Sequence, residues 1–313
     1  MKPDVRRAAE ILRAGGLVAF PTETVYGLGA DASNARAVAR LYAVKRRPPG
    51  HPVIVHFAFS QIAFSFARDV PPTALKLAEQ FWPGPLTLIL KRSPLARDFV
   101  TGGQDGVGVR VPSHPVAHAM LEAFGGGVAA PSANRFGLVS PTTAQHVRED
   151  LGADVDLVLD GGPSEVGIES TIVDLSGGET VLLRPGVITK LQLEDALKTR
   201  IHEKTPDSPR HPGGLERHYA PRTPTRLVAA FELDRELSGS GVSNAVLAFS
   251  RPDERVDFWI RMPRDPAAYA HKLYAALREL DGADCARILI ETPPDDPAWQ
   301  AVNDRLRRAA GAA

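Results

Sequence analysis

The sequence predicts two α/β domains joined by a linker that is rich in proline and glycine. Three observations favour this. Short β-like runs alternate with helical runs between residues 5 and 200, prolines and glycines cluster between residues 198 and 224, and a shorter alternating segment completes the chain. Alternation of this kind is typical of a sheet covered by helices. A chain of 313 residues also exceeds the usual size of one domain.

The first predicted domain covers residues 1–200. Its predicted strands are residues 17–20, 53–57, 86–91, 107–111, 128–130, 157–159, 172–175 and 181–184. Its predicted helices are residues 5–14, 35–46, 73–81, 114–124, 143–151 and 192–201. The strands are short apolar runs rich in valine, leucine and isoleucine, which is the usual composition of buried strands.

A linker over residues 201–225 and a second domain over residues 226–313 complete the prediction. The linker contains Pro206, Pro209, Pro212, Gly213, Gly214 and Pro221 among charged residues. In the second domain we expect strands at 226–230, 245–250 and 286–291 and helices at 267–280 and 297–310. The helix at 267–280 has one apolar stripe, which is typical of a helix packed on a sheet.

Composition and charge exclude several classes of protein. The chain is 43% hydrophobic and 24% charged, and 37 basic residues balance 37 acidic ones. A protein held on nucleic acid by phosphate neutralisation normally has a basic excess, so we expect RNA contact to be transient at most. Cys285 is the only cysteine, which excludes an internal disulfide and a multi-cysteine metal site. No apolar run approaches the ~20 residues of a membrane span, and we expect a cytoplasmic protein.

The segment at residues 21–29 is the first candidate for chemistry. The phosphate loop, dinucleotide fingerprint, zinc protease and serine hydrolase motifs are all absent from the sequence. We expect residues 21–29 to form a hydroxyl-rich loop that ends in glycine, follows a predicted strand and includes Thr24. α/β folds place ligands after strand ends. An ordinary capped turn would have the same composition, and both interpretations stay open.

Three cations stand at the end of the predicted helix 35–46. Lys45 lies on the buried stripe of that helix, while Arg46 and Arg47 follow at its end. Such cations can simply complement the helix dipole. A lysine and an arginine together can also bind a polyphosphate, because one supplies a point charge and the other a planar fork of donors.

Two strand residues are candidates for contact with a small ligand. In residues 107–111, Gly108 and Arg110 share one face, so a ligand carboxylate could reach the guanidinium beside the glycine. An internal aspartate or glutamate would satisfy Arg110 equally well. His56 ends the strand 53–57, where a lone histidine is more often structural than catalytic.

Further polar residues follow the later strands. Ser132 and Asn134 come after the strand 128–130, and Ser140 precedes a predicted helix. Hydroxyl groups and free backbone N–H groups at a helix start can hold an anion or simply cap the helix. Ser170 precedes the strand 172–175, and Arg184 closes the strand after that.

In this order and spacing, these segments resemble the Sua5/YrdC/YciO family, in its long Sua5-type branch. The matching segments are 21–29 (PTETVYGLG), 45–48 (KRRP) with His51 and His56, 82–87 (WPGPLT), 109–112 (VRVP), 131–134 (PSAN), 140–143 (SPTT), 160–162 (DGG), 169–171 (EST), 184–186 (RPG), 217–221 (RHYAP) and, in the C-terminal domain, 274–278 (YAALR) and 303–306 (NDRL). The resemblance covers nearly the whole chain. It implies a YrdC-like twisted mixed sheet with helices and an open concave ligand cavity, followed by a small Rossmann-like C-terminal α/β domain.

The resemblance also implies an activity. Members of this family are nucleotidyltransferases that convert L-threonine, bicarbonate and ATP into threonylcarbamoyl-AMP and pyrophosphate. The product feeds the downstream machinery that makes t6A at position 37 of tRNA. Mg²⁺ is expected with the triphosphate, without ligands from the protein.

Residue roles follow from the matched positions. The resemblance places L-threonine at Thr24, His56, Arg110, Ala130 and Ser170. It places ATP at Lys45, Arg47, His51, Gly106, Ser132, Asn134, Ser140, Arg184 and His218. Lys45 and Arg47 are expected to be catalytic, because their charge offsets the repulsion between two anionic reactants. His56 and bicarbonate itself are both candidates for the base that deprotonates the threonine amine.

The chain departs from the family pattern at three places. His51 stands where relatives usually carry Asn or Asp, Phe136 follows the PSAN segment, and the linker before residue 217 is longer and less aromatic. Two other functions remain to be weighed: an RNA-binding protein without catalysis, and a divergent YciO-like member. We also expect the linker to fold over the active site as a lid that carries His218.

Overall fold

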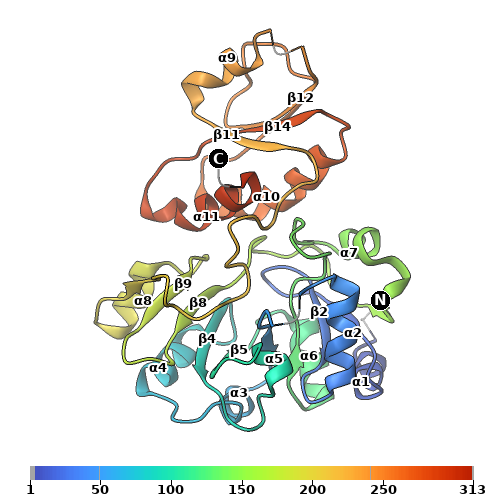
Figure 1. Ribbon diagram of the computed structural model, residues 1–313, viewed down its shortest axis with the longest axis vertical. Helices are drawn as coiled ribbons and strands as arrows, with labels where there is room; N and C mark the ends of the chain where they lie inside the picture. Colours follow the sequence, from blue (N-terminus) through green and yellow to red (C-terminus); the bar gives the residue numbers. More distant parts are fainter. Residues whose placement is uncertain (1–3, 49, 240, 312–313) are drawn as a thin grey trace.

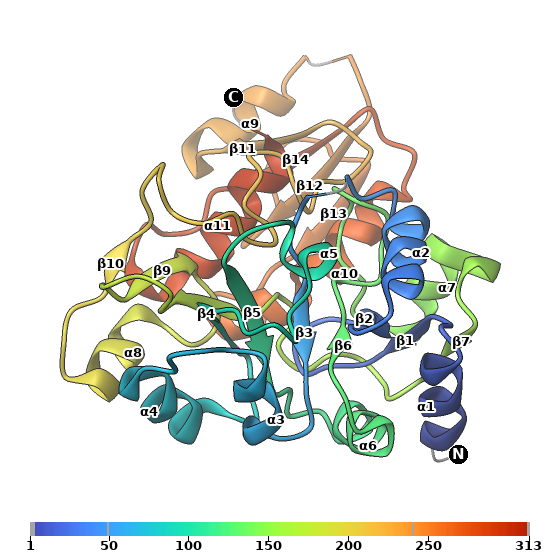
Figure 2. The same ribbon diagram turned by 60° about the horizontal axis from the view of Figure 1, so that its bottom comes forward.

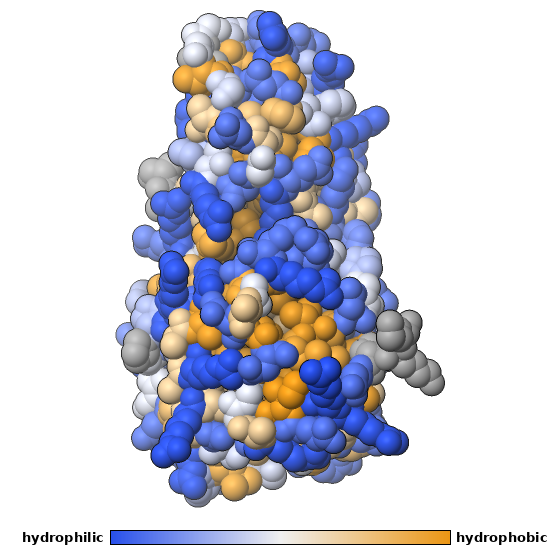
Figure 3. Space-filling view, turned by 90° about the vertical axis from the view of Figure 1, so that its right-hand side faces the viewer, coloured by the Kyte–Doolittle hydropathy of each residue, from blue (hydrophilic) through white to orange (hydrophobic). Residues whose placement is uncertain are grey.

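The computed structural model describes residues 4–48, 50–239 and 241–311. It has a larger part that contains the N-terminus and a smaller C-terminal part stacked on it (Figure 1). Both parts are α/β, as the sequence predicts, and the last two residues of the predicted second domain lie outside the described residues. Seen from the side of α1, α2 and α7, the surface is mainly hydrophilic, with an apolar area on the larger part (Figure 3).

The larger part is built on a ten-stranded mixed sheet (Figure 2). The strand order is β10-β9-β8-β4-β5-β3-β6-β2-β1-β7. The strands are β1 Val18–Phe20, β2 Gly27–Asp31, β3 Ile54–His56, β4 Leu86–Lys91, β5 Gly106–Arg110, β6 Val128–Ala129, β7 Leu157–Val158, β8 Thr171–Asp174, β9 Val181–Arg184 and β10 His202–Glu203. The mixed sheet expected from the family resemblance is therefore confirmed.

Helices cover one face of this sheet and part of the other. They are α1 Val5–Arg13, α2 Ala35–Lys45, α3 Ser60–Ser65, α4 Pro72–Phe81, α5 Asp98–Thr101, α6 Pro115–Phe124, α7 Ala144–Leu151 and α8 Lys190–Leu197, with a 3₁₀ turn at Gly152–Asp154. Helices α2, α3, α4, α7 and α8 contribute to the main apolar core. Helices α1 and α6 pack together on a second core that contains Phe20. Burial of this apolar surface is the main force that holds the sheet together.

All eight strands predicted for the larger part are present, but the prediction for residues 21–29 is wrong at its end. Gly27 and Gly29 lie in β2, where they pair with Phe20 and Val18 of β1. A Cβ on Gly29 would lie 3.0 Å from Cε1 of Phe20 and 2.8 Å from Cγ1 of Val128. These glycines therefore permit close packing inside a sheet, where we expected a loop. Helices α3 and α5 and the short strand β10, which lies inside the predicted linker, were also not predicted.

The smaller part has a four-stranded parallel sheet of order β11-β14-β12-β13. Its elements are β11 Thr225–Val228, α9 Leu233–Leu237, β12 Asn244–Ala248, β13 Phe258–Arg261, α10 Pro266–Asp281, β14 Arg287–Glu291 and α11 Gln300–Ala310, with 3₁₀ turns at Ala230–Glu232 and Pro297–Trp299. Strand β13 was not predicted, because its residues FWIR follow a charged, turn-rich segment. A parallel sheet with helices on both faces fits the expected Rossmann-like architecture.

Helices α10 and α11 lie between the small sheet and the larger part (Figure 1). Their apolar core includes Leu273 and Leu277 of α10 and Leu306 of α11. The same cluster contains Val25, Val139 and Ile168 of the larger part, together with Tyr219 of the linker. The two parts therefore share one continuous apolar core beside the segments that carry the predicted site residues.

Among the described residues, no helix combines the length and the apolar composition that crossing a membrane requires.

Candidate active site

Strands β3 and β5 place His56 and Arg110 side by side. The strands are parallel, and their register pairs the two residues directly. Paired residues on adjacent strands point to the same face of a sheet, so both side chains enter one space. Burial, together with the charge of Arg110, lowers the pKa of His56 to about 3. The imidazole is therefore neutral at physiological pH, and its buried Nδ1 has no hydrogen-bond partner among the described residues.

Arg110 is held by three donated hydrogen bonds. Its Nε donates to the Gly84 carbonyl at 3.2 Å, and its Nη1 donates to Oγ1 of Thr24 at 3.0 Å. Its Nη2 donates to Oε1 of Glu23 at 2.6 Å, in an ion pair whose side chains are each 4% exposed. The internal acid that the sequence left open as a partner is therefore Glu23. A guanidinium has five N–H groups, so two of them remain for a ligand.

The glycines of β5 do not widen the site. A Cβ on Gly108 would lie 3.1 Å from Cδ1 of Ile89 and 3.5 Å from Cγ1 of Ile54. Isoleucine side chains thus fill the space that we expected to admit a ligand, and that interpretation of Gly108 is wrong. Gly106 lies at the other end of β5, about 13 Å along the strand from Arg110.

Ser170 joins the hydroxyl groups of the site to a second arginine. Its Oγ is 2.8 Å from Oγ1 of Thr87 and accepts a hydrogen bond from Nη2 of Arg184 at 3.0 Å. Nε of Arg184 donates to the Ser170 carbonyl at 2.9 Å, and Nη1 donates to the carbonyl of Pro212 at 3.1 Å. Arg184 therefore fixes both the carbonyl oxygen and the hydroxyl oxygen of Ser170 and connects this residue to the linker.

Lys45 holds the segment after β6. Its Nζ donates to the carbonyls of Ser132 and Asn134, the latter at 2.5 Å. The side chain is buried, and burial together with the nearby charge of Arg47 brings the pKa of Lys45 well below its ordinary value. The predicted burial of Lys45 on the stripe of α2 is confirmed. In this structure its ammonium donors meet backbone carbonyls, which fixes the segment that carries Ser132 and Asn134.

Arg47 turns back toward the same space. Arg46 ends α2 with a left-handed backbone, at φ 54°, and this turn directs the chain back over the helix end. Nη2 of Arg47 donates to the carbonyl of Pro52 at 2.8 Å, and its guanidinium lies 5.3 Å from the ring centre of Phe136. Its buried Nε has no hydrogen-bond partner among the described residues. Arg47 therefore retains donor capacity for a ligand.

The linker covers this space with His218 and Tyr219. The ring of His218 lies 5.7 Å from that of Phe136 and 4.1 Å from that of Tyr219. Burial lowers the pKa of His218 to about 3. The hydroxyl of Tyr219 lies 3.4 Å from Nη1 of Arg184. The linker is thus packed against the same arginine that fixes Ser170.

These residues line two neighbouring cavities. The first is lined by all five residues predicted to bind threonine, Thr24, His56, Arg110, Ala130 and Ser170, together with Arg47, Ser132, Arg184 and His218. The second is lined by Arg47, His51, Phe136, Arg210, His211 and His218 among others. The first encloses about 50 Å³ and the second about 470 Å³. Lys45, Gly106, Asn134 and Ser140 line neither cavity. The contacts of all these residues with threonine or ATP stay predictions.

The described residues contain no group of three or more His, Cys, Asp or Glu side chains that could hold a metal ion. The charged side chains of the first cavity include three arginines, Arg47, Arg110 and Arg184, which suit anionic ligands.

Sequence reasoning missed several residues of the site. Glu23, Glu169, Tyr274 and Arg305 all lie inside segments that resemble the family, but none of them was given a role. Tyr274 and Arg305 come from the C-terminal part and reach Glu169. An acidic residue inside a hydroxyl-rich motif could have indicated Glu23, whereas the match of residues 303–306 to the family does not by itself indicate what Arg305 contacts.

Comparison with family models gives two matches that together cover most of the chain. The Sua5/YciO/YrdC model, described as "Telomere recombination", matches residues 10–186. A second model, described as the C-terminal domain of threonylcarbamoyl-AMP synthase, matches residues 188–311.

Individual relatives match over nearly their full length. The threonylcarbamoyl-AMP synthase of Pyrococcus abyssi is 38% identical, with 98% of this chain and 94% of the relative covered. That of Bacillus subtilis is 37% identical, with 99% and 93% covered. The crystal structure of P. abyssi Sua5 complexed with L-threonine superposes with a TM-score of 0.90 at 37% identity, covering 98% of this chain and 94% of that one.

Proposed function

The chain belongs to the Sua5/YciO/YrdC family, and on that premise we propose that it is an enzyme that forms threonylcarbamoyl-AMP and pyrophosphate from L-threonine, bicarbonate and ATP. The observation that carries the proposal is the first cavity, where a neutral histidine, three arginines and several hydroxyl groups converge. The two full-length relatives are threonylcarbamoyl-AMP synthases by name. RNA binding without catalysis and a YciO-like function are less favoured, since the matching relatives include the C-terminal part.

L-threonine fits the wall made by β3, β5 and the segment after β1. The free N–H groups of Arg110 can bind the carboxylate, because charge-assisted and paired hydrogen bonds are the strongest of their kind. Thr24 and Ser170 offer hydroxyl groups, and Nδ1 of His56 offers an unused position for a hydrogen bond. A protein in the same family has been solved with L-threonine bound, which supports this assignment.

The reaction joins two anions and therefore needs positive charge. The threonine amine adds to bicarbonate with loss of water, which gives an N-carboxylate. An oxygen of that carboxylate attacks the α-phosphorus of ATP, and pyrophosphate leaves. Arg47 and Arg184 line the cavity and can offset both the repulsion and the charge that develops on the leaving group. Most of the catalysis is then positioning and electrostatics.

ATP is expected to span the two cavities. Arg47 and His218 line both, so the triphosphate can lie in the first cavity while the nucleoside reaches His51 and Phe136 in the second. Mg²⁺ supplies charge neutralisation when it is bound to the triphosphate. The basic lining fits a metal that arrives with ATP better than one held by protein carboxylates. Lys45 acts in this scheme through the carbonyls of Ser132 and Asn134.

The base for the threonine amine is better assigned to bicarbonate than to His56. A group with a pKa of about 3 is a weak base near neutral pH. The neutral imidazole instead suits a hydrogen-bonding role toward the bound amino acid.

The linker is proposed to act as a lid. A first cavity of about 50 Å³ has room for only a few water molecules, so the linker must shift before threonine and a triphosphate can enter together. We expect proteolytic cleavage between Arg200 and Arg217 to slow when ATP and threonine are added. Equal cleavage rates with and without both substrates would overturn the lid.

The domain boundaries remain part of the proposal. We place the linker at residues 201–225, between a catalytic domain at 1–200 and a C-terminal domain at 226–313. Strand β10 pairs with β9 of the large sheet, so the first residues of the linker are anchored to the catalytic domain. We further propose that the protein works in the cytoplasm, passes its product to the t6A machinery and contacts tRNA at most transiently.

The direct test is pyrophosphate release by the purified protein with ATP, bicarbonate and Mg²⁺, with and without L-threonine. We expect release that depends on threonine and a product with the mass of threonylcarbamoyl-AMP. Absence of both would overturn the proposed function.

A further inference from the structure

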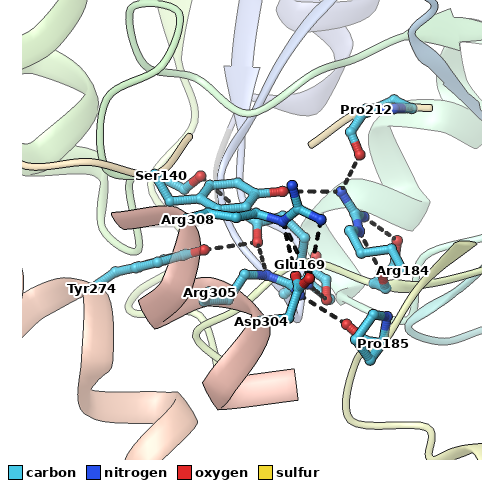
Figure 4. A network of polar contacts seen from close by, with 12 residues as sticks. Ser140, Glu169, Arg184, Pro185, Pro212, Tyr274, Asp304, Arg305 and Arg308 are labelled. Atoms are coloured by element: carbon cyan, nitrogen blue, oxygen red, sulfur yellow. Dashed lines mark hydrogen bonds and ion pairs between the residues drawn. The ribbon is translucent and has the colours of Figure 1, made fainter. Parts of the chain in front are cut away.

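Glu169 lies at the meeting point of the two parts of the molecule (Figure 4). Its carboxylate accepts three hydrogen bonds. Oε1 accepts from the Ser140 hydroxyl at 2.6 Å, and Oε2 accepts from the hydroxyl of Tyr274 and from Nε of Arg305, both at 2.9 Å. Glu169 and Ser140 belong to the larger part, whereas Tyr274 and Arg305 lie on α10 and α11. One buried carboxylate therefore links two helices of the C-terminal part to the lining of the first cavity.

Arg305 holds more than the carboxylate. It is fully buried, and its Nη2 donates to the backbone carbonyl of Glu169 at 3.2 Å, while Nη1 donates to that of Pro185 at 2.9 Å. Its guanidinium also lies 5.4 Å from the ring centre of Tyr219. Arg305 thus touches the residue before Ser170, the residue after Arg184 and the linker. Two of these contacts adjoin Ser170 and Arg184, which line the first cavity.

Ser140 is fixed from two sides, by Glu169 of the larger part and by Arg278 of the C-terminal part. Its hydroxyl donates to Glu169, and its carbonyl accepts from Nε of Arg278 at 3.4 Å. Arg278, on α10, also forms a largely buried ion pair with Asp150 at the end of α7. A hydroxyl that donates to a carboxylate cannot donate to a phosphate at the same time. Ser140 is therefore held in a fixed place where it can accept a hydrogen bond but has no proton to offer.

The residues next to Ser140 and Glu169 also hold the loop that carries Thr24. The carbonyl of Pro141 accepts from the backbone N–H of Tyr26 at 2.9 Å, and the carbonyl of Thr24 accepts from the N–H of Gly167 at 3.1 Å. The segments on either side of Glu169 and Ser140 thereby fix the loop that carries Thr24. A shift of the carboxylate would be passed to both sides of the first cavity.

We propose that Tyr274 and Arg305 are positioning residues for the adenylation reaction, acting through Glu169 to fix Ser140, Ser170 and the Thr24 loop. The C-terminal part is then a structural component of the active site of the larger part. This inference rests on the proposed function.

The charge balance agrees with this role. Burial by itself would raise the pKa of Glu169, but the charges of Arg305 and Arg184 and the Ser140 hydrogen bond outweigh it, so the pKa lies below its ordinary value. The carboxylate stays ionised and therefore keeps accepting from all three donors.

The chain offers a matched pair of variants on one helix. Tyr274 and Tyr269 are both buried tyrosines of α10, but the hydroxyl of Tyr269 has no hydrogen-bond partner among the described residues. Tyr274→Phe and Tyr269→Phe remove the same atom from two buried positions of one helix. We expect Tyr274→Phe to lower kcat about tenfold, the usual worth of a hydrogen bond to a charged group, and Tyr269→Phe to leave kcat unchanged. Thermal unfolding of both variants is measured alongside.

A double-mutant cycle tests the route through Glu169. If Tyr274 acts on Ser140, then adding Tyr274→Phe to Ser140→Ala should lower kcat by less than the product of the two single effects. Glu169→Gln should lower kcat about 100-fold or more, because it disturbs all three partners at once. Where Glu169→Gln does not fold, the tyrosine pair and the cycle still decide the question.

The outcomes separate the two proposals. Wild-type protein without threonine-dependent pyrophosphate release overturns the proposed function itself. Active wild-type protein in which Tyr274→Phe keeps full kcat, or loses only thermal stability, overturns the positioning role. Fully multiplicative effects of Tyr274→Phe and Ser140→Ala would also contradict it, because independent sites give that result.

Discussion

The two walls of the first cavity are built in different ways. On the strand wall, His56 and Arg110 are adjacent because of backbone register between β3 and β5. On a second wall, the lining residue Glu169 is held by Arg305 across 136 residues of sequence through buried side-chain contacts. The first wall follows from secondary structure, whereas the second depends on how two folded parts meet. A site can therefore be predictable on one side and hidden from the sequence on the other.

The difference also concerns where charge is buried. The Arg110–Glu23 pair lies within one part, and each of its side chains is 4% exposed. The Arg305–Glu169 pair crosses between parts, and its side chains are 0% and 9% exposed. Removal of one partner from a buried pair leaves an uncompensated charge, which costs about 3–5 kcal/mol. Both walls should therefore tolerate substitution of their arginines poorly.

The largest expected effect is that of Arg110→Ala on the strand wall. We expect it to raise the KM for threonine about 100-fold or more while changing the KM for ATP by less than about threefold, because the lost guanidinium binds the amino-acid carboxylate. Steady-state kinetics with each substrate varied in turn measures both constants. Arg68→Ala is the control, since Arg68 is an exposed arginine that pairs with Asp105.

Equal increases in both KM values would show that Arg110 does not bind the carboxylate. If Arg110→Ala does not fold, Arg110→Lys keeps the test, because a lysine cannot reproduce the planar set of donors.

The next effect compares the strand wall with the linker that covers the site, through the pH dependence of stability. His56 and His218 both have a pKa of about 3 in the folded protein, below the ordinary value of 6.5. A group with a lowered histidine pKa stays neutral when folded and takes up a proton on unfolding, so stability is full above pH 6.5 and falls as the pH drops toward 3. Between pH 7 and pH 5 each such histidine should lower the free energy of unfolding by about 2 kcal/mol.

Urea unfolding of His56→Gln and His218→Gln at pH 7 and pH 5 sharpens the comparison. His56→Gln should abolish the whole decrease in the free energy of unfolding that this histidine causes between pH 7 and pH 5. His218→Gln should remove less, because an opening linker lets His218 take up a proton without global unfolding. Equal changes in the two variants would indicate a linker that stays closed until the whole protein unfolds.

The smallest expected effect concerns the packing behind the strand wall. Gly29→Ala should lower the free energy of unfolding by about 1–3 kcal/mol, because the new Cβ would lie 2.8 Å from Cγ1 of Val128. Gly177→Ala is the matched control, since a Cβ there meets nothing within 4 Å, and its effect should stay within about 0.5 kcal/mol. Similar losses in both variants would mean that Gly29 is not held in tight packing.

Much of the fold could be predicted because apolar runs and helical stripes are local signals. The strands that were not predicted also have local features that explain why. Strand β2 carries Gly27 and Gly29, which are typical of turns, but both glycines pair with β1 and leave room for the ring of Phe20. Strand β13 is short and follows a segment rich in charge and turns. Where side-chain pattern and tertiary pairing disagree, the pairing decides the structure.

The site shows the same limit. The family motifs identified the residues that line the first cavity, including Thr24 and Ser170. The partner of Arg110 was left open, because a guanidinium can pair with an internal carboxylate as readily as with a ligand. Arg305 lies in the basic run RLRR of α11, which has the composition of a solvated helix face, yet it is fully buried. Its role depends on the contact between the two parts, which no short stretch of sequence encodes.

The most direct test of a single site built from both walls is a crystal structure of this chain with L-threonine and a non-hydrolysable ATP analogue. We expect threonine between Thr24, His56 and Arg110, and the triphosphate between Arg47 and Arg184, with Glu169 still bound to Tyr274 and Arg305. Ligands bound outside the first cavity, or a Glu169 carboxylate released from the C-terminal helices, would contradict the account.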